Sequence, residues 1–211
     1  MSCRVYLIRH GETEWNNTMK FQGATDIPLS ERGRRQAVSL GKRLAALKLD
    51  AFYASDLVRA RETATIISSR HGMSIETIPA LRELNFGAWE GLTIAEIQKL
   101  FANELEQWWE NPFSIRIPGG ETYNELIERS VNAIKEIVAR HSDGRIAVVS
   151  HGGPIRSIVG SVLEMDLGKY WRLGLHNGSL SILDFTGWEY GILTLFNDCS
   201  HLAGNNAGSS Y

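Results

Sequence analysis

The chain has 211 residues, of which 43% are apolar, enough to bury a substantial core and unlike the composition of a disordered chain. Its 24 acidic and 22 basic residues leave a formal charge of −2, which gives no global support for a nucleic-acid groove or an anionic membrane surface. Because there are only two cysteines and the N-terminal apolar run covers just Val5 to Ile8, we expect a cytoplasmic protein. Affinity for anions must come from a local cluster of basic side chains.

Short apolar runs predict the strands of a sheet. Four of them cover 4–8, 52–54, 75–78 and 146–149. Their length and β-branched residues are typical of strands that are buried on both faces. Two further runs, 180–185 and 192–196, predict a closing hairpin around Thr186 and Gly187.

Helical periodicity separates the first strands. One helix is expected to begin near Ser30, and a second is expected to follow Ser55 or Asp56 as its capping residue. Strand and helix signals alternate along most of the chain. This alternation predicts a three-layer α/β/α fold, with a mostly parallel sheet and helices on both faces.

The middle of the chain has a different pattern. Capping boxes open two helical stretches, about 93–110 and 122–140, and a segment rich in proline and glycine lies between them. We expect these stretches to form a small helical insertion over one edge of the sheet. The tail 203–211 is small and polar, and we expect it to pack poorly.

These patterns predict a single domain over residues 1–211. Its core would be formed by about 1–78 and 141–200, and the insertion would cover about 79–140. We find no internal repeats.

Two histidines directly follow predicted strands. His10 follows the first strand, His151 follows the strand 146–149, and each precedes a glycine, which lets backbone N–H groups approach a ligand. The turn after His151 also opens a helix, whose N-terminus favours an anion. Because ligands bind beyond the carboxyl ends of strands in open α/β sheets, we expect both imidazoles in one site, together with Arg9 and Arg59.

These residue types match the requirements of phosphoryl transfer, which are a nucleophile, neutralisation of the equatorial oxygens and a proton for the leaving alkoxide. A neutral His10 is the candidate nucleophile, and the two arginines are the candidate phosphate clamps. A second, protonated histidine at position 151 would complement the charge on the transferring group. Glu83, in a loop after the third strand, is the candidate acid, and Glu12 is its competitor.

A block near the N-terminus and several later segments form an ordered set. The segments are Arg9-His10-Gly11-Glu12-Thr13-Glu14-Trp15-Asn16, Gln22-Gly23, Asp26-Ile27-Pro28-Leu29-Ser30, Ser55-Asp56-Leu57 with Arg59-Ala60, Phe86-Gly87-Ala88-Trp89-Glu90-Gly91, Pro118-Gly119-Gly120-Glu121 and Ser150-His151-Gly152-Gly153. In content and in order they strongly resemble the histidine phosphatase superfamily, also called the phosphoglycerate mutase-like family. The resemblance runs from about residue 4 to about residue 200.

The resemblance implies a covalent phosphohistidine at His10, with Glu83 as proton donor and acceptor. Residues that match the family's phosphate and substrate contacts are Arg9, Asn16, Gln22, Gly23, Arg59, Glu83, His151 and Gly152. Family members use no metal, so the resemblance implies no metal site and no cofactor. For Glu83 to act as an acid near neutral pH, its pKa must lie above the ordinary value of about 4.3; the phosphate charge and the apolar Phe86 and Trp89 would raise it.

Three functions fit these residues. The first is hydrolysis of a small phosphorylated metabolite, and within the phosphatases the likeness is greatest to α-ribazole phosphatases and broad-specificity phosphatases. The second is a cofactor-dependent phosphoglycerate mutase, although mutases of this family typically carry a longer insertion. The third is a catalytically inactive phosphate-binding module, which the complete set of catalytic positions argues against.

Phosphoserine phosphatase is a further possibility within the first function. The ending Asn197 to Leu202 resembles metal-independent enzymes of that specificity, but these usually have a histidine where this chain has Phe86. We expect a small-molecule substrate and neither a nucleic-acid nor a membrane partner. A homodimer through the exposed edge of the final hairpin stays open.

Other features are expected to be structural. The remaining histidines, His71, His141, His176 and His201, are expected to be structural or exposed. The pair Trp108 and Trp109 is expected to bury one helical face rather than to form a lid over the substrate.

Overall fold

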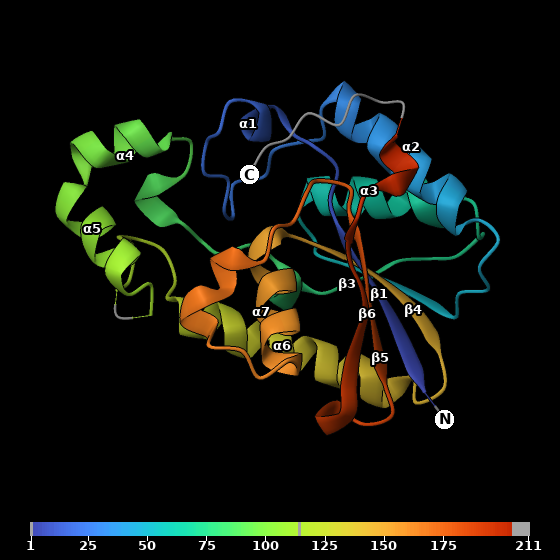
Figure 1. Cartoon of the computed structure of the whole chain (residues 1–211). Coiled ribbons are helices and arrows are strands. Elements are labelled where there is room, and N and C mark those ends of the chain that lie inside the picture. Colours follow the sequence, from blue (N-terminus) through green and yellow to red (C-terminus); the bar gives the residue numbers. More distant parts are fainter. Residues whose placement is uncertain (1, 114, 204–211) are drawn as a thin grey trace.

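The computed structural model describes residues 2–113 and 115–203 and contains one six-stranded sheet (Figure 1). The strands are β1 (Cys3–Arg9), β2 (Ala51–Ala54), β3 (Glu76–Thr77), β4 (Arg145–Ser150), β5 (Leu180–Phe185) and β6 (Gly191–Asp198). Their order is β3-β2-β4-β1-β5-β6; the first four pair in parallel, and β5 and β6 are antiparallel. The predicted mostly parallel sheet is confirmed. The expected poor packing of the tail 203–211 concerns residues that, after position 203, lie outside the described range.

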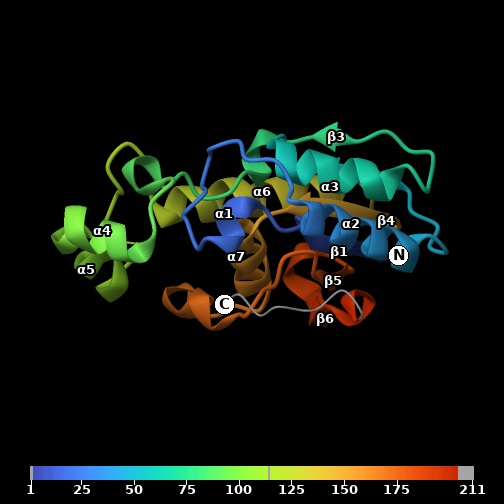
Figure 2. The same cartoon turned by 90° about the horizontal axis from the view of Figure 1, so that it is seen from above.

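Helices cover both faces of this sheet. They are α1 (Glu14–Asn17), α2 (Glu31–Leu44), α3 (Val58–Ser68), α4 (Ile94–Leu100), α5 (Ala102–Glu110), α6 (Tyr123–Arg140) and α7 (Gly152–Val162). Short 3₁₀ turns are η1 (Pro79–Leu81), η2 (Gly87–Trp89), η3 (Leu167–Arg172), η4 (Trp188–Tyr190) and η5 (Ser200–Leu202). Figures 1 and 2 show α2 and α3 over one face and α6 and α7 over the other, which confirms the three layers. None of the helices in the described ranges is both long and apolar enough to cross a bilayer.

The alternation of side chains along β1 divides the core between the two faces. Val5 and Leu7 pack in the cluster that includes apolar residues of α6 and α7. Tyr6 and Ile8 pack in the opposite cluster, with residues of α2 and α3. A strand buried on both faces is what the continuous apolar run predicted.

The insertion is smaller than the sequence predicted. The stretch 93–110 is divided into α4 and α5 at Phe101, and these two helices extend away from the sheet (Figures 1 and 2). The C-terminal half of α6 does not belong to the insertion, because its Ala133, Ile134 and Ile137 pack in the main core against the sheet, whereas Tyr123 and Leu126 at its start pack with the insertion. The part that stands apart has its own small core, with the fully buried Trp89 among its members.

The start of α3 also differs from the prediction. Its N-cap is Leu57, which makes no side-chain cap, so neither Ser55 nor Asp56 has that role. Instead the carboxylate of Asp26, from a distant loop, accepts a hydrogen bond from the backbone N–H of Val58 at 2.6 Å. A tertiary contact therefore caps this helix, and local sequence could not show it.

Candidate active site

The two histidines lie together because of the register of the sheet. Strands β1 and β4 are parallel neighbours, and Arg9 pairs with Ser150 at their carboxyl ends. His10 and His151 are the next residues on the two strands, and their ring centroids are 5.0 Å apart. Their exposed fractions are 3% and 0%, respectively. The expected convergence of the two imidazoles is therefore present in the structure.

The hydrogen bond of His10 fixes its tautomer. Its Nδ1 lies 2.7 Å from the backbone oxygen of Gly11, which can only accept, so Nδ1 carries the proton. The other ring nitrogen, Nε2, then has a lone pair. Burial and the charges of Arg59 and Arg9 hold the pKa of His10 well below its ordinary value of 6.5. At neutral pH, His10 is therefore a neutral imidazole with a nucleophilic Nε2.

His151 has the opposite tautomer. The Nε of Arg59 donates to Nδ1 of His151 at 3.2 Å, so the ring proton lies on Nε2. This Nε2 is buried and has no partner among the described residues. Burial and the charge of Arg59 hold the pKa of His151 well below 6.5, so the expected protonated state is wrong for the free protein. A neutral His151 still offers one N–H to a bound oxyanion.

Arg59 is completely buried, and its guanidinium is held on three sides. Besides the bond to His151, Nη1 donates to the oxygen of Thr25 at 2.9 Å and Nη2 to that of Gly23 at 2.7 Å. Arginine has five N–H donors, and these contacts use three of them, so two remain for a ligand. Burial lowers the pKa of Arg59 to about 10, which keeps the group charged at neutral pH.

The loop that holds Arg59 is itself organised by Glu90, which sequence reasoning did not select. One carboxylate oxygen of Glu90 accepts from the N–H of Ala24, and the other accepts from the N–H of Thr25, both at 2.8 Å. Gly23 has a positive φ of 54°, and a Cβ there would lie 2.0 Å from a Glu90 oxygen. Only glycine fits at this position.

A cavity of about 480 Å³ opens beside the histidines. Predicted residues that line it are Arg9, Asn16, Gln22, Gly23, Arg59 and Glu83. Phe86, expected beside Glu83, also lines it. The other lining residues are Trp15, Met19, Lys20, Phe21, Ile94, Arg156, Trp171, Gly174, Leu175 and His176. Three of the predicted residues, His10, His151 and Gly152, do not line the cavity. His151 bonds to Arg59, which does line it, and a side chain at position 152 would contact Arg156, another residue of the wall.

Arg9 and Arg156 bring two more guanidinium groups to this cavity. Arg9 donates to the oxygen of Leu175 at 2.5 Å, and its buried Nε has no partner in the described chain. Burial and the charge of Arg156 lower the pKa of Arg9 to about 10. Arg156 donates from Nε to the oxygen of Leu173 at 2.8 Å. The sequence could have indicated Arg156 as a site residue, because it lies four residues after Gly152 on α7 and residues four apart share a helix face.

Asn16 is held in the cavity wall through its amide oxygen. Its Oδ1 accepts from the N–H of Thr13 at 3.0 Å, a contact within the local turn, and also from Asn177 at 3.2 Å. Because Oδ1 is occupied in this way, the amide NH₂ is the group available to the cavity. Asn177 also donates to the oxygen of His10 at 3.3 Å, a supporting role that its position in an Asn-Gly turn did not reveal. Gln22 lines the same wall, and its buried Oε1 has no partner among residues 2–113 and 115–203.

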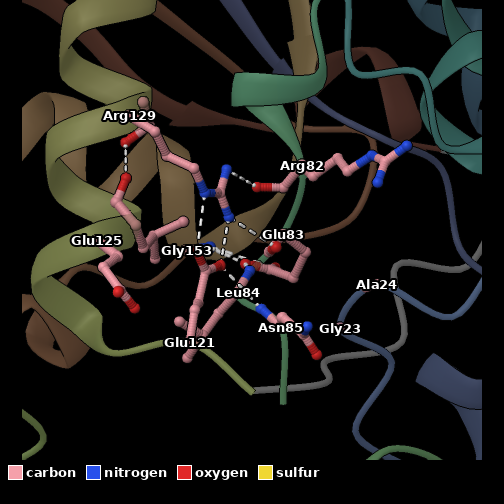
Figure 3. Close-up of polar contacts among 12 residues, drawn as sticks. Gly23, Ala24, Arg82, Glu83, Leu84, Asn85, Glu121, Glu125, Arg129 and Gly153 are labelled. Atoms are coloured by element: carbon pink, nitrogen blue, oxygen red, sulfur yellow. Dashed lines mark hydrogen bonds and ion pairs between the residues drawn. The ribbon is translucent and has the colours of Figure 1, made fainter. Parts of the chain in front are cut away.

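Glu83 lies at the N-terminus of α7, and Figure 3 shows it beside Gly153. Its carboxylate accepts from the N–H of Leu84 at 2.9 Å and from that of Gly153 at 3.0 Å. The competitor Glu12 instead forms an ion pair with Arg32 at 3.1 Å and does not line the cavity. Geometry therefore favours Glu83 as the acid.

Of the other four histidines, only His176 lines the cavity in the described structure. His141 contacts the hydroxyl of Tyr53 at 2.9 Å, and His201 contacts the oxygen of Gly178 at 2.9 Å. His176 lines the cavity, so its expected structural or exposed role was incomplete. Neither tryptophan of the pair 108–109 lines the cavity. Trp108 packs on Trp89 as expected, but Trp109 is 58% exposed, so the expected burial is wrong for Trp109.

No group of three or more His, Cys, Asp or Glu side chains that could hold a metal occurs in the described ranges. The residues that converge at the cavity are instead imidazole, guanidinium and carboxylate groups suited to a phosphate.

The family model of the histidine phosphatase superfamily (branch 1) matches residues 5–198. The chain belongs to this superfamily, whose members are phosphatases or mutases, and a phosphatase is the class supported here.

Named relatives include both classes. Phosphoserine phosphatase 1 of Hydrogenobacter thermophilus is 32% identical over 196 residues, covering 93% of each chain. "Probable phosphoglycerate mutase GpmB" of Erwinia tasmaniensis is 35% identical over 210 residues, covering 94% of each. The solved structure of Bacillus stearothermophilus YhfR has a TM-score of 0.89 and 33% identity, and the match covers 95% of this chain and 99% of that one.

Proposed function

We propose that this protein is a metal-independent phosphomonoesterase that hydrolyses a small phosphorylated metabolite through a phosphohistidine on His10. The observation that carries the proposal is the tautomer of His10. Its Nδ1–H is bound to the oxygen of Gly11, and its pKa is held below 6.5, so Nε2 is available for attack. The charged Arg9 and Arg59 and the Nε2–H of His151 would then bind the oxygens of the phosphate.

The first step would transfer the phosphoryl group to the protein. Nε2 of His10 attacks phosphorus, and the bond from phosphorus to the ester oxygen breaks. The leaving oxygen takes a proton from Glu83, while Arg9, Arg59 and His151 neutralise the equatorial oxygens. The Nδ1–H bond to Gly11 stabilises the imidazole as it gains positive charge.

The second step would return His10 to its free form. Glu83, now a carboxylate, takes a proton from a water molecule that attacks the phosphohistidine, and the P–N bond breaks to release inorganic phosphate. Of helices α4 and α5, only Ile94 contributes to the cavity wall, so these two helices cover little of the site. This arrangement supports hydrolysis over the mutase alternative, which needs a second phosphoryl acceptor instead of water.

The leaving group would lie among aromatic and cationic side chains. Phe86, Trp15 and Trp171 contribute apolar surface, and Lys20 and Arg156 contribute charge beyond the phosphate clamps. α-Ribazole phosphate is the substrate we place first. Phe86 stands in the cavity wall where phosphoserine phosphatases usually have a histidine, which argues against phosphoserine as the main substrate.

The test is hydrolysis of p-nitrophenyl phosphate by the purified protein in the presence of EDTA. We expect turnover that EDTA leaves unchanged; loss of activity with EDTA would contradict the metal-independent mechanism. A panel containing α-ribazole phosphate, phosphoserine and 3-phosphoglycerate would then rank substrates. Interconversion of 2- and 3-phosphoglycerate with 2,3-bisphosphoglycerate, faster than any hydrolysis, would favour the mutase.

A further inference from the structure

The backbone that carries Glu83 is held by one arginine from a distant helix. Arg129 of α6 donates from Nη1 to the oxygens of Ala80 and Arg82, both at 2.7 Å. Its Nη2 donates to the oxygen of Glu83 itself at 2.9 Å. Figure 3 shows the guanidinium facing the backbone of Arg82 and Glu83. The guanidinium of Arg129 therefore fixes the backbone of Glu83 and of the residues just before it.

A carboxylate completes this arrangement. Glu121 accepts from Nε of Arg129 at 3.0 Å and from Nη2 at 2.5 Å, and both side chains are about four-fifths buried, with exposed fractions of 18% and 23%. These two bonds and the three to carbonyl groups occupy all five N–H donors of the guanidinium. A lysine has three donors on a single nitrogen and could not make the same set of contacts.

Glu121 also fixes the backbone on the other side of Glu83. Its Oε1 accepts from the N–H of Asn85 at 2.9 Å, and its own N–H donates to the oxygen of Asn85 at 3.0 Å. A Cβ at the preceding Gly120 would lie 2.3 Å from that same oxygen, so the two segments are in direct backbone contact. Residues 80–85 are thus held at both ends of the short stretch that contains Glu83.

We propose that Arg129 and Glu121 are positioning residues that hold the carboxylate of Glu83 where it can protonate the leaving group. Neither side chain lines the cavity, so they act through Glu83 and not on the substrate. This inference rests on the proposed function of Glu83 as general acid. A displacement of about 1 Å of a catalytic group can lower a rate on the order of 100-fold, so the precision of this anchor affects catalysis directly.

How strongly a substitution lowers kcat/KM on substrates with different leaving groups distinguishes a positioning role from a purely structural one. An alkyl phosphate such as β-glycerol phosphate has a poor leaving group that needs a proton, whereas p-nitrophenolate leaves readily without one. The parameter to compare is kcat/KM, because it reports the phosphoryl transfer and excludes the later hydrolysis of the phosphohistidine.

The experiment compares three variants with the wild type on both substrates. Glu83→Gln is expected to lower kcat/KM for the alkyl phosphate about 100-fold, and for the aryl phosphate far less. Arg129→Gln is expected to lower the alkyl value about tenfold and to change the aryl value less than about twofold. Arg116→Gln is the matched control: this exposed arginine bonds Gly120 and Glu125 in the same region but not the Glu83 segment, and it should change neither value.

A double variant gives the second measurement. In the Glu83→Gln background, Arg129→Gln should cause no further loss on the alkyl phosphate, because the group that it positions is already absent. Equal losses on both substrates, or a full additional loss in the double variant, would overturn the proposal. If Arg129→Gln does not fold, Glu121→Gln takes its place with the same expected pattern.

The outcomes for the two proposals are distinguishable. If Glu83→Gln shows no dependence on the leaving group, the role of Glu83 in the proposed function fails. If Glu83→Gln lowers kcat/KM mainly for the alkyl phosphate, but neither the Arg129 nor the Glu121 variant does so, only the positioning inference fails.

Discussion

Arg59 and Gly23 are joined by a hydrogen bond of 2.7 Å from the guanidinium Nη2 to the backbone oxygen. The contact links Arg59, the proposed phosphate clamp on α3, to the loop that follows α1, and the shape of that loop depends on the glycine at position 23. Loop geometry and phosphate affinity should therefore change together.

Substitution of Gly23 by alanine tests this link. The new Cβ would lie 2.0 Å from a Glu90 oxygen in backbone with φ of 54°, so the loop must shift away from Arg59. We expect Gly23→Ala to lower stability by about 2–4 kcal/mol, from backbone strain and steric overlap, and to raise the KM for p-nitrophenyl phosphate.

Gly72→Ala is the control for that change. Its φ of 62° carries the same backbone strain, but no atom of the described chain lies within 4 Å of the added Cβ. It should cost about 1–2 kcal/mol and leave KM unchanged. Urea unfolding and steady-state kinetics measure both; similar kinetics for the two variants would contradict the link.

Removal of the nucleophile gives the most direct prediction. His10→Ala should lower kcat by about 10⁴-fold or more, because no other group can form the covalent intermediate. Wild-type protein mixed with substrate and stopped with alkali should carry one phosphoryl group on His10, detected by mass spectrometry. His71→Ala, outside the cavity, should keep both activity and phosphorylation. A labelled His10→Ala protein would refute the assignment.

Stability should depend on pH through the two buried histidines. Both have pKa values held well below 6.5, so below that pH the unfolded chain binds protons that the native state does not. Stability is therefore fully present above about pH 6.5 and falls as the pH decreases, by up to about 1.4 kcal/mol per unit for each histidine.

His151→Gln removes one of these groups. Between about pH 7.5 and about pH 5.5, the free energy of unfolding of this variant should change with a shallower slope than that of the wild type. Urea titrations at several pH values give both slopes, and His141→Gln serves as a comparison outside the site. Identical slopes for His151→Gln and the wild type would mean that His151 is not buried in its neutral form.

Arg156 is predicted to bind a negatively charged group on the leaving part of the substrate. It forms no ion pair with an acidic side chain in the part of the chain that the structure describes, and it lines the cavity. Arg156→Gln should raise the KM for 3-phosphoglycerate about tenfold, the effect of one lost charged hydrogen bond, and leave p-nitrophenyl phosphate within about twofold. Arg172→Gln, which lies outside the cavity, should affect neither. Equal effects on both substrates would assign Arg156 to the phosphate instead.

The sequence predicted the principal site residues because they are tied to strand ends. His10 and His151 each follow a buried apolar run, and parallel strands bring their carboxyl ends to one edge of a sheet. The residues that support them carry no such signal. Arg129 lies on an ordinary amphipathic helix, and nothing in its local sequence shows that its guanidinium meets the backbone of residues 80–85.

Local patterns determined the elements of this protein, their alternation and the chemistry available at the strand ends, since periodicity and turn residues act over a few positions. Only the tertiary structure decided the protonation of the two histidines and the cap of α3 by Asp26. It also decided that the C-terminal half of α6 belongs to the main core rather than to the insertion. Burial, hydrogen-bond partners and nearby charges come from segments far apart in the chain, and these set the state of each catalytic group.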